Sequence, residues 1–230
     1  MNTQPHSQFA QSLTSISKMK SIIAYIFLFF AVFSHNAIAA NLTDEEKEYI
    51  AAFQPIADEA ANSGISVRVA IIGNYSPKLT KVFMTFKDGQ CVLGLNLRND
   101  RNHVDPLDVD APGVDRRQML NAVLAHEMGH CFAYTEAKNP NPQPQVSLEE
   151  SHQEELHADL FALAWTSIYH PEDFQATMSY FKTFRSGLMK IQPEYHGATP
   201  AELTAAIEFR KSEVRSNPDF LMKVATGNYK

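Results

Sequence analysis

The sequence predicts an α+β fold in a single domain, with a small antiparallel sheet, one long central helix and a mostly helical C-terminal part. Three short segments between residues 65 and 97 are rich in β-branched and aromatic residues, which favours strands. After residue 116, apolar residues recur at helical spacing instead. Without an N-terminal leader the chain has about 190 residues, enough for one domain with a sizeable core.

The first 39 residues have the features of a secretory signal peptide. Lysines precede an apolar run over residues 21–33, and Ala37-Ile38-Ala39 supplies the small residues of a cleavage site. Met19 is an alternative start, because the residues before it make a long and polar beginning for such a segment. The apolar run is shorter than the roughly 20 residues of a bilayer span, so we expect contact with a membrane only if the segment stays uncleaved. The sequence therefore predicts export, to the periplasm or the medium, and a mature domain over residues 40–230.

Four elements are expected ahead of the long helix. The first is a helix over residues 42–62, whose apolar residues recur on one face. Three strands follow, and Asp88-Gly89 is a typical hairpin turn between the second and the third. The strands are expected at residues 65–72, 80–86 and 91–97. A hairpin with one further strand predicts a small antiparallel sheet.

The long helix carries the most informative motif of the chain, His126-Glu127-Met128-Gly129-His130. Residues four apart lie one turn apart on the same helix face, so the imidazoles of His126 and His130 can converge on one metal ion. Glu127 would lie beside that ion. A zinc hydrolase needs a carboxylate in this place to take a proton from the attacking water.

A catalytic zinc ion usually has three protein ligands and one open position, so a third ligand is expected downstream. A capping box at residues 147–150 begins a second helix, on which Glu155 and Asp159 lie one turn apart. This spacing suits a ligand carboxylate and a second carboxylate that accepts the free ring N–H of a zinc-bound histidine. We favour Glu155 as the ligand and Asp159 as that acceptor. A helix rotated from this orientation would present another ligand: His152, Glu154 or His157.

The pairing of this motif with the later Glu155-Leu156-His157-Ala158-Asp159 resembles the gluzincin metallopeptidases. The resemblance covers residues 120–165, about a fifth of the chain, and it points to no single subfamily. It implies a zincin-like fold in which the edge strand of the sheet binds an extended substrate as a further strand. It also implies that His126, His130 and Glu155 are the zinc ligands. Glu127 would then be the catalytic base, and Asp159 the carboxylate that supports a ligand histidine.

A second zinc-peptidase pattern, that of the metzincins, fits less well. It requires a glycine and a third histidine at fixed places after the second histidine. This chain has Ala133 in the place of the glycine and Glu136 in the place of the histidine. Both differences disfavour a metzincin site.

The gluzincin resemblance also implies a downstream histidine, tyrosine or arginine that stabilises the oxyanion formed on the substrate carbonyl. We favour His196, which lies at a loop-to-helix junction where a side chain can reach into a cleft. A surface histidine in a turn is the competing interpretation. The other candidates are Tyr195, Tyr180 and His170. The helices expected in this part of the chain cover residues 171–186, 199–215 and 219–224.

Cys91 and Cys131 are the two cysteines of the chain. In an exported protein an even pair is a candidate disulfide, which here would connect a strand to the helix with the metal motif. Two buried free thiols are the alternative, and the sequence leaves both open.

These features together predict an exported zinc metallopeptidase with one zinc ion and a peptide or protein substrate. Glu127 would activate the attacking water and later protonate the leaving amine. Nucleic acid is not expected as a partner, because the net charge is −6 and the sequence has no cluster of Lys and Arg. The alternatives are a zinc-dependent hydrolase of a non-peptide cell-envelope amide and a zinc-stabilised binding module without turnover. A binding module would have no use for the Glu127 carboxylate.

Overall fold

The computed structural model describes residues 42–73, 80–98, 111–136, 148–191, 201 and 223–224. From Glu45 onward the chain forms one compact unit, and of the preceding unit, Met1–Asp44, only the last three residues are described. The expected signal peptide at residues 1–39 lies outside the described part. None of the described helices is both long enough and apolar enough to cross a membrane.

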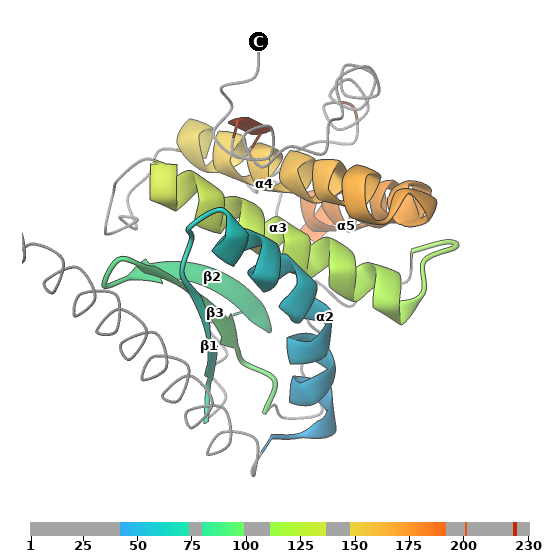
Figure 1. The fold of residues 1–230 in the computed structure, drawn as a ribbon. Helices are drawn as coiled ribbons and strands as arrows, with labels where there is room; N and C mark the ends of the chain where they lie inside the picture. Colours follow the sequence, from blue (N-terminus) through green and yellow to red (C-terminus); the bar gives the residue numbers. More distant parts are fainter. Residues whose placement is uncertain are drawn as a thin grey trace, which may run out of the picture. The chain divides into compact units, whose positions relative to one another are not determined.

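The described elements form an α+β fold that is mostly helical, with four α-helices and a three-stranded sheet (Figure 1). The helix expected from residue 171 begins as a 3-10 turn, which Pro171 opens, and continues as an α-helix from Phe174. The helices expected at residues 199–215 and 219–224 lie almost wholly outside the described residues. In chain order the elements are α2 (Asp44–Asn62), β1 (Val67–Ile71), β2 (Val82–Lys87), β3 (Gln90–Leu95), α3 (Arg116–Glu136), α4 (Leu148–Tyr169), η1 (Pro171–Asp173) and α5 (Phe174–Ile191).

The sheet is mixed, so the expectation of an antiparallel sheet is wrong for one of its two strand pairs. β2 and β3 form the predicted hairpin, in which Asp88 and Gly89 have φ angles of 54° and 76°. β1 pairs with β3 in parallel, and the strand order is β1-β3-β2. β3 thus inserts between two strands that precede it in the chain. The alternation of side chains along a strand indicates its buried face but not its neighbour, so the pattern could not show this arrangement.

α3 packs on the sheet next to β2, and α4 and α5 pack on α3 (Figure 1). β3 is the central strand and is buried along its whole length after Gln90. Apolar side chains from the helices and from the sheet form one core, to which α2 contributes Phe53, β3 Leu93, α3 Leu124 and α4 Phe161. This shared core holds α3 between the sheet and α4.

Gly129 lets α3 and α4 approach each other closely. A Cβ atom at this position would lie 2.8 Å from the Cα atom of Ala158 and 3.0 Å from the Cβ atom of Phe161, both on α4. These separations are shorter than van der Waals contact, so a larger residue would push the helices apart. The glycine inside the metal motif therefore has a packing role: it brings α4 against the face of α3 that carries the two histidines.

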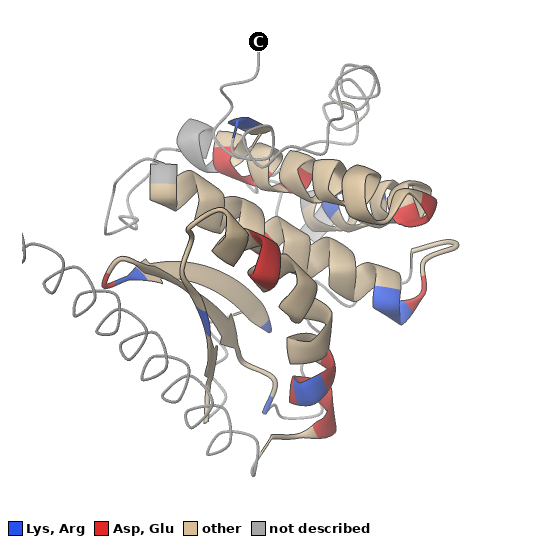
Figure 2. Ribbon diagram, viewed as in Figure 1, with Lys and Arg blue, Asp and Glu red and all other residues tan. Residues whose placement is uncertain are grey.

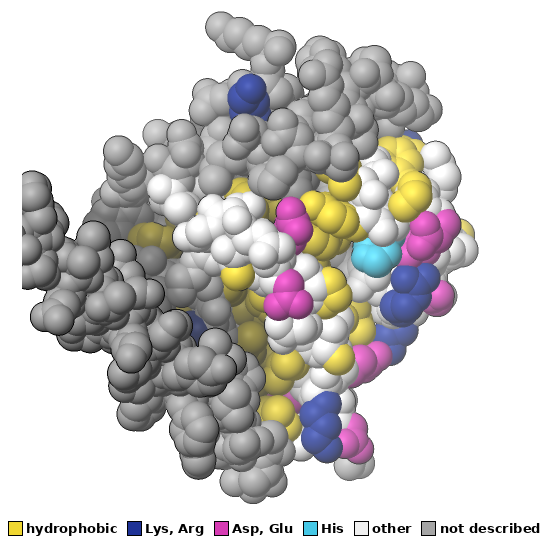
Figure 3. Space-filling model, viewed as in Figure 1, with side chains coloured by type: hydrophobic (Ala, Val, Ile, Leu, Met, Phe, Trp, Pro, Cys, Tyr) yellow, Lys and Arg dark blue, Asp and Glu magenta, His cyan; other side chains and the backbone are white. Residues whose placement is uncertain are grey.

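Ion pairs connect the start of α3 to its neighbours. Arg116 pairs with Glu48 of α2 at 2.8 Å, and Arg117 pairs with Asp173 of η1 at 2.7 Å. Figure 2 shows charged residues near the ends of these helices, and in Figure 3 acidic and basic side chains lie next to one another along one edge of the visible face. The Arg116–Glu48 pair is exposed, and such a pair contributes at most about 1 kcal/mol. In the second pair the Asp173 carboxylate is buried and also accepts a hydrogen bond from Gln118, so this pair fixes the start of α3 against η1.

Candidate metal centre

The structure brings together the three residues that the sequence predicts as metal ligands. The Nε2 atoms of His126 and His130, one turn apart on α3, are separated by 3.1 Å. Glu155 of α4 places one carboxylate oxygen 3.4 Å from Nε2 of His126 and the other 3.6 Å from Nε2 of His130. One ligand atom from each residue lies within 4.8 Å of the other two.

The spacing of these atoms fits a zinc ion. Zinc in proteins takes nitrogen and oxygen ligands at roughly 2.0–2.2 Å, and a tetrahedron with such bonds has edges of about 3.3 Å. The three observed separations lie close to that edge length. Two imidazoles and one carboxylate also form the donor set of catalytic zinc sites, which keep a fourth position for water or substrate.

Asp159 holds the ring of His126 in a fixed orientation. Its carboxylate lies 2.8 Å from Nδ1 of His126 and is fully buried. A hydrogen bond from Nδ1–H to this carboxylate leaves Nε2 for the metal. Asp159 thus contacts the ring of one of the two predicted ligand histidines, and that histidine is His126.

Arg185 of α5 is a part of the centre that the sequence analysis missed. Its Nε donates to Asp159 at 2.8 Å, and its Nη2 donates to Asp159 at 2.7 Å and to Glu155 at 3.1 Å. The arginine is almost fully buried. A signal for it exists in the sequence, because Arg185 interrupts the apolar face of α5, and a buried cation requires an acidic partner.

The alternative third ligands do not join the group of converging atoms. Glu154 lines the same cavity, but the group formed by described residues around the two histidines contains Glu155 and neither Glu154, His152 nor His157. A second group of potential ligands, His170, Glu172 and Asp173, lies at the junction of α4 and α5. There the Asp173 carboxylate already accepts hydrogen bonds from Arg117 and Gln118. The geometry therefore favours Glu155.

The candidates for an oxyanion-stabilising residue are distributed differently. His196 and Tyr195 lie outside the described residues, so His196 stays a prediction. His170 lies at the end of α4 and is not among the described residues that line the cavity, whereas Tyr180 of α5 lines it but is almost fully buried.

A cavity of about 260 Å³ opens at the metal centre. One wall is the edge strand β2 with Thr80, two residues before it, another is the motif face of α3, and a third is an aromatic segment of α5. The described residues lining it are Thr80, Val82, Phe83, Met84, Val123, His126, Glu127, His130, Tyr134, Glu154, Glu155, Tyr180, Phe181, Phe184 and Arg185.

The strand beside the cavity has a backbone edge that points away from the sheet. Asn96 N–H donates to the Lys81 carbonyl at 2.8 Å, and opposite pairs in an antiparallel ladder alternate between hydrogen-bonded and non-bonded. The backbone groups of Val82 and Met84 therefore point away from β3. The Met84 backbone donates to the carboxylate of Glu127, which places the predicted base at this edge.

Burial and close charges shift the ionisation of the centre in the metal-free protein. Burial raises the pKa of Glu127 to about 7, although the charge of His126 opposes it. Burial lowers the pKa of His130 to about 4, so its ring is neutral at pH 7. At His126 burial acts in the same direction, but hydrogen bonds to Asp159 and Glu155 outweigh it and raise the pKa to about 10. Metal binding therefore competes with a proton on His126.

The two carboxylates that face the histidines show the opposite balance. Burial alone would raise the pKa of Glu155 and of Asp159. The hydrogen bonds and positive charges of His126 and Arg185 outweigh burial, and the pKa of each carboxyl is lower than usual. Both groups are therefore carboxylates at neutral pH, the form that binds a metal or orients a histidine.

Removal of the Glu127 charge is expected to stabilise the metal-free protein at alkaline pH. In the unfolded chain this carboxyl ionises near its ordinary pKa of 4.5, so between that pH and about 7 the unfolded chain releases a proton that the folded protein keeps. Stability therefore falls across this interval as the pH rises, by on the order of 3 kcal/mol. Chelator-treated Glu127→Gln should have a higher Tm than the wild type near pH 8 and the same Tm near pH 4. If the variant and the wild type had equal Tm values at pH 8 as well as at pH 4, the raised pKa of Glu127 would be wrong.

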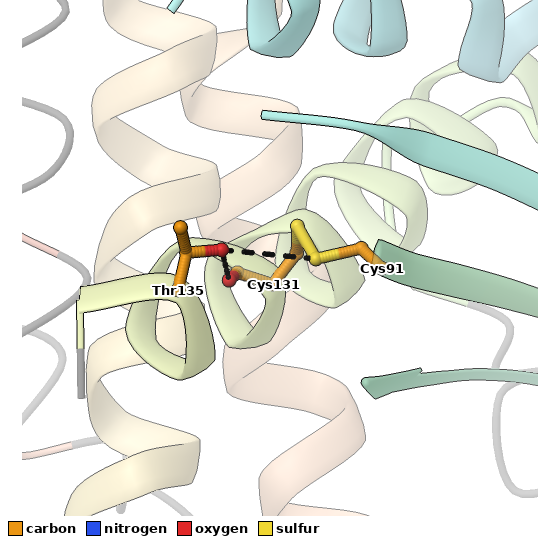
Figure 4. The surroundings of a disulfide bond; sticks show 3 residues. All are labelled: Cys91, Cys131 and Thr135. Carbon is orange, nitrogen blue, oxygen red and sulfur yellow. Dashed lines mark hydrogen bonds between the residues drawn. A yellow bond between two sulfur atoms is a disulfide. The ribbon is translucent and has the colours of Figure 1, made fainter. Parts of the chain in front are cut away.

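A disulfide joins Cys91 of β3 to Cys131 of α3, with the two Cα atoms 5.7 Å apart (Figure 4). Both cysteines are fully buried. Thr135, one turn further along α3, donates a hydrogen bond to the Cys131 carbonyl at 2.9 Å. Of the two alternatives that the sequence left open, the structure has the disulfide. Since Cys131 follows His130 directly, the bond ties the helix that carries the two motif histidines to the central strand.

Loss of the disulfide is expected to destabilise the protein strongly. The bond closes a loop with a sequence separation of 40 residues, and the chain-entropy relation gives about 4 kcal/mol for a loop of this length. Urea unfolding of the Cys91→Ala/Cys131→Ala variant should show this loss, and reduced wild-type protein serves as the comparison. A change below about 1 kcal/mol in the free energy of unfolding would be inconsistent with such a constraint.

No protein-family model matches the chain, and comparisons with curated proteins and with solved structures found no match.

Proposed function

We propose that this protein is an exported zinc-dependent peptidase. One observation carries the proposal: the ligand atoms of His126, His130 and Glu155 converge beside the Glu127 carboxylate, in a cavity that β2, the edge strand of the described sheet, lines. Structural zinc sites close the fourth position with another side chain and need no adjacent carboxylate, whereas hydrolytic sites need both an open position and a base.

Each residue of the centre would have a separate role in hydrolysis. Zinc, when bound by the three ligands, supplies a Lewis acid that polarises the substrate carbonyl. Glu127 takes the proton of the attacking water and returns it to the leaving amine, which is general base and then general acid catalysis. Asp159 and Arg185 hold His126 and Glu155 in the orientation that binding requires.

The edge of β2 supports a peptide as the substrate. An extended peptide can pair with outward-pointing backbone groups of an edge strand, which bind any sequence through the main chain. Here Val82 and Met84 line the same cavity as the base and the ligands. The Val82 carbonyl accepts from Thr80 Oγ1 and the Met84 N–H donates to Glu127, so a peptide would pair with the Val82 N–H and the Met84 carbonyl. The aromatic wall formed by Phe83, Phe181 and Phe184 gives an apolar surface for a substrate side chain.

The disulfide supports export, because disulfides persist in oxidising compartments and are rare in the cytosol. If the signal segment is cleaved as the sequence predicts, protein recovered from the periplasm or the medium begins near residue 40. An N-terminus at residue 1 on exported protein would contradict cleavage.

The test is metal analysis and peptide cleavage on the same purified protein. The proposal predicts one zinc ion per chain and cleavage of a fluorogenic peptide library that stops with a chelator and resumes when zinc is added. Stoichiometric zinc without cleavage of any peptide would contradict the peptidase and favour a non-peptide amide hydrolase or a binding module. Absence of zinc binding would contradict the metal centre itself.

A further inference from the structure

Tyr134 lies at the metal centre but belongs to no part of the motif. It follows His130 by four residues and Glu127 by seven, so all three lie on one face of α3. Its ring stacks on the His130 imidazole, with centroids 6.1 Å apart and planes 18° from parallel. Side chains on a helix lean toward its N-terminus, so this position directs Tyr134 back toward the ligands, and it lines the cavity.

The hydroxyl of Tyr134 is available as a donor. Within the described ranges, no hydrogen bond joins this hydroxyl to another residue. It is also not a fully buried group, because Ser63 Oγ is the one fully buried side-chain oxygen or nitrogen without a partner among the described residues. Tyr134 is half-buried and lines the cavity, so its hydroxyl can meet a molecule bound there. It can donate a hydrogen bond to that molecule without breaking one to a described residue.

The other polar side chains around the cavity already have partners or roles within the protein. Thr80 Oγ1 donates to the Val82 carbonyl at 2.6 Å, and Arg185 donates to Glu155 and Asp159. The histidine Nε2 atoms face the candidate metal position, and the ionised carboxylate of Glu155 only accepts hydrogen bonds. Glu127 is the predicted base, and Tyr180 is almost fully buried. Among the described lining residues, Tyr134 thus combines an open donor with a place on the ligand face of α3.

Attack on a peptide carbonyl moves negative charge onto its oxygen, and a donor aimed at that oxygen stabilises the transition state more than the ground state. We propose that Tyr134 is a catalytic residue whose hydroxyl donates a hydrogen bond to the substrate carbonyl oxygen as this charge develops. The phenol keeps its proton throughout, so the step needs no further acid or base. The inference rests on the proposed peptidase function. It assigns to Tyr134 the stabilisation of the oxyanion, for which the sequence favours His196.

Tyr134→Phe tests the proposal, because it removes the hydroxyl and keeps the ring on His130. We expect kcat to fall by about 10²- to 10³-fold, with KM and zinc content unchanged. The affinity for a phosphonate peptide that mimics the tetrahedral intermediate should fall by a similar factor, while affinity for a product peptide stays the same. Tyr169→Phe is the matched control, since Tyr169 lies at the end of α4 outside the lining residues, and it should keep the wild-type kcat.

The outcomes separate this inference from the proposed function. Undiminished kcat in Tyr134→Phe, with cleavage by the wild type, would overturn the role of Tyr134 and leave the peptidase intact. An equal loss of affinity for the product peptide would also overturn it, since it would indicate uniform binding. A large loss of kcat in His196→Ala alone would assign the role to His196 instead. Absence of cleavage by the wild type would overturn the proposed function and this inference together.

Discussion

Replacement of Glu127 by Gln is expected to abolish most turnover while the protein keeps its zinc. The amide has nearly the same shape as the carboxyl group but cannot accept a proton, and loss of a general base typically lowers the rate by about 10²- to 10⁴-fold. Glu127 is not among the three ligand residues, so metal content should not change. The measurement is kcat on a peptide cleaved by the wild type, with zinc per chain determined on the same sample.

Glu48→Gln is the matched control for this variant. It makes the same chemical change at an exposed position: Glu48 of α2 pairs with Arg116 of α3 and does not line the cavity. It should leave both kcat and zinc content at wild-type values. If Glu127→Gln retained full activity, Glu127 would not be the base and the hydrolytic mechanism would need another proton acceptor.

Replacement of Glu155 by Ala is expected to weaken zinc binding more than replacement of a residue that only hydrogen-bonds to a ligand. Loss of a supporting hydrogen-bond partner costs about 10- to 100-fold in metal affinity, and loss of a direct ligand should exceed this range. The variant also removes one of the carboxylates that Arg185 contacts, at 3.1 Å. The measurement is zinc affinity by competition with a coloured chelator, with circular dichroism to verify that the helices persist.

Glu154→Ala provides the comparison, because Glu154 precedes Glu155 on α4 and lines the same cavity without joining the converging atoms. It should bind zinc like the wild type. The reverse result, weak binding in Glu154→Ala and normal binding in Glu155→Ala, would show that α4 is rotated relative to the described geometry. Normal binding in both would move the third ligand to His152 or His157.

The arrangement of the candidate ligands could be predicted from the sequence to the extent that its parts are local. The repeat of the α-helix alone places His126 and His130 on one face, and the same repeat relates Glu155 to Asp159. How two helices meet depends on packing between distant segments. The contact of Gly129 with Ala158 gives the physical reason for the meeting, but it is visible only once both helices are folded.

Two pairings could not be predicted because their partners lie far apart in the chain. Arg185 lies 26 residues after Asp159, and no local pattern couples them. The parallel pairing of β1 with β3 was missed for a similar reason, since the hairpin at Asp88-Gly89 has a local turn signal and the β1 pairing has none. The disulfide was one of two open alternatives, because a pair of cysteines in a sequence does not reveal the distance between them.

The most direct test of the central claim is a crystal structure of zinc-loaded protein with diffraction data collected on both sides of the zinc absorption edge. We expect one anomalous peak at roughly 2.0–2.2 Å from the Nε2 atoms of His126 and His130 and from a carboxylate oxygen of Glu155. The peak should also lie beside the Glu127 carboxylate without contacting it. A peak at His170 and Asp173, or none at the two motif histidines, would contradict the proposed metal centre and the peptidase built on it.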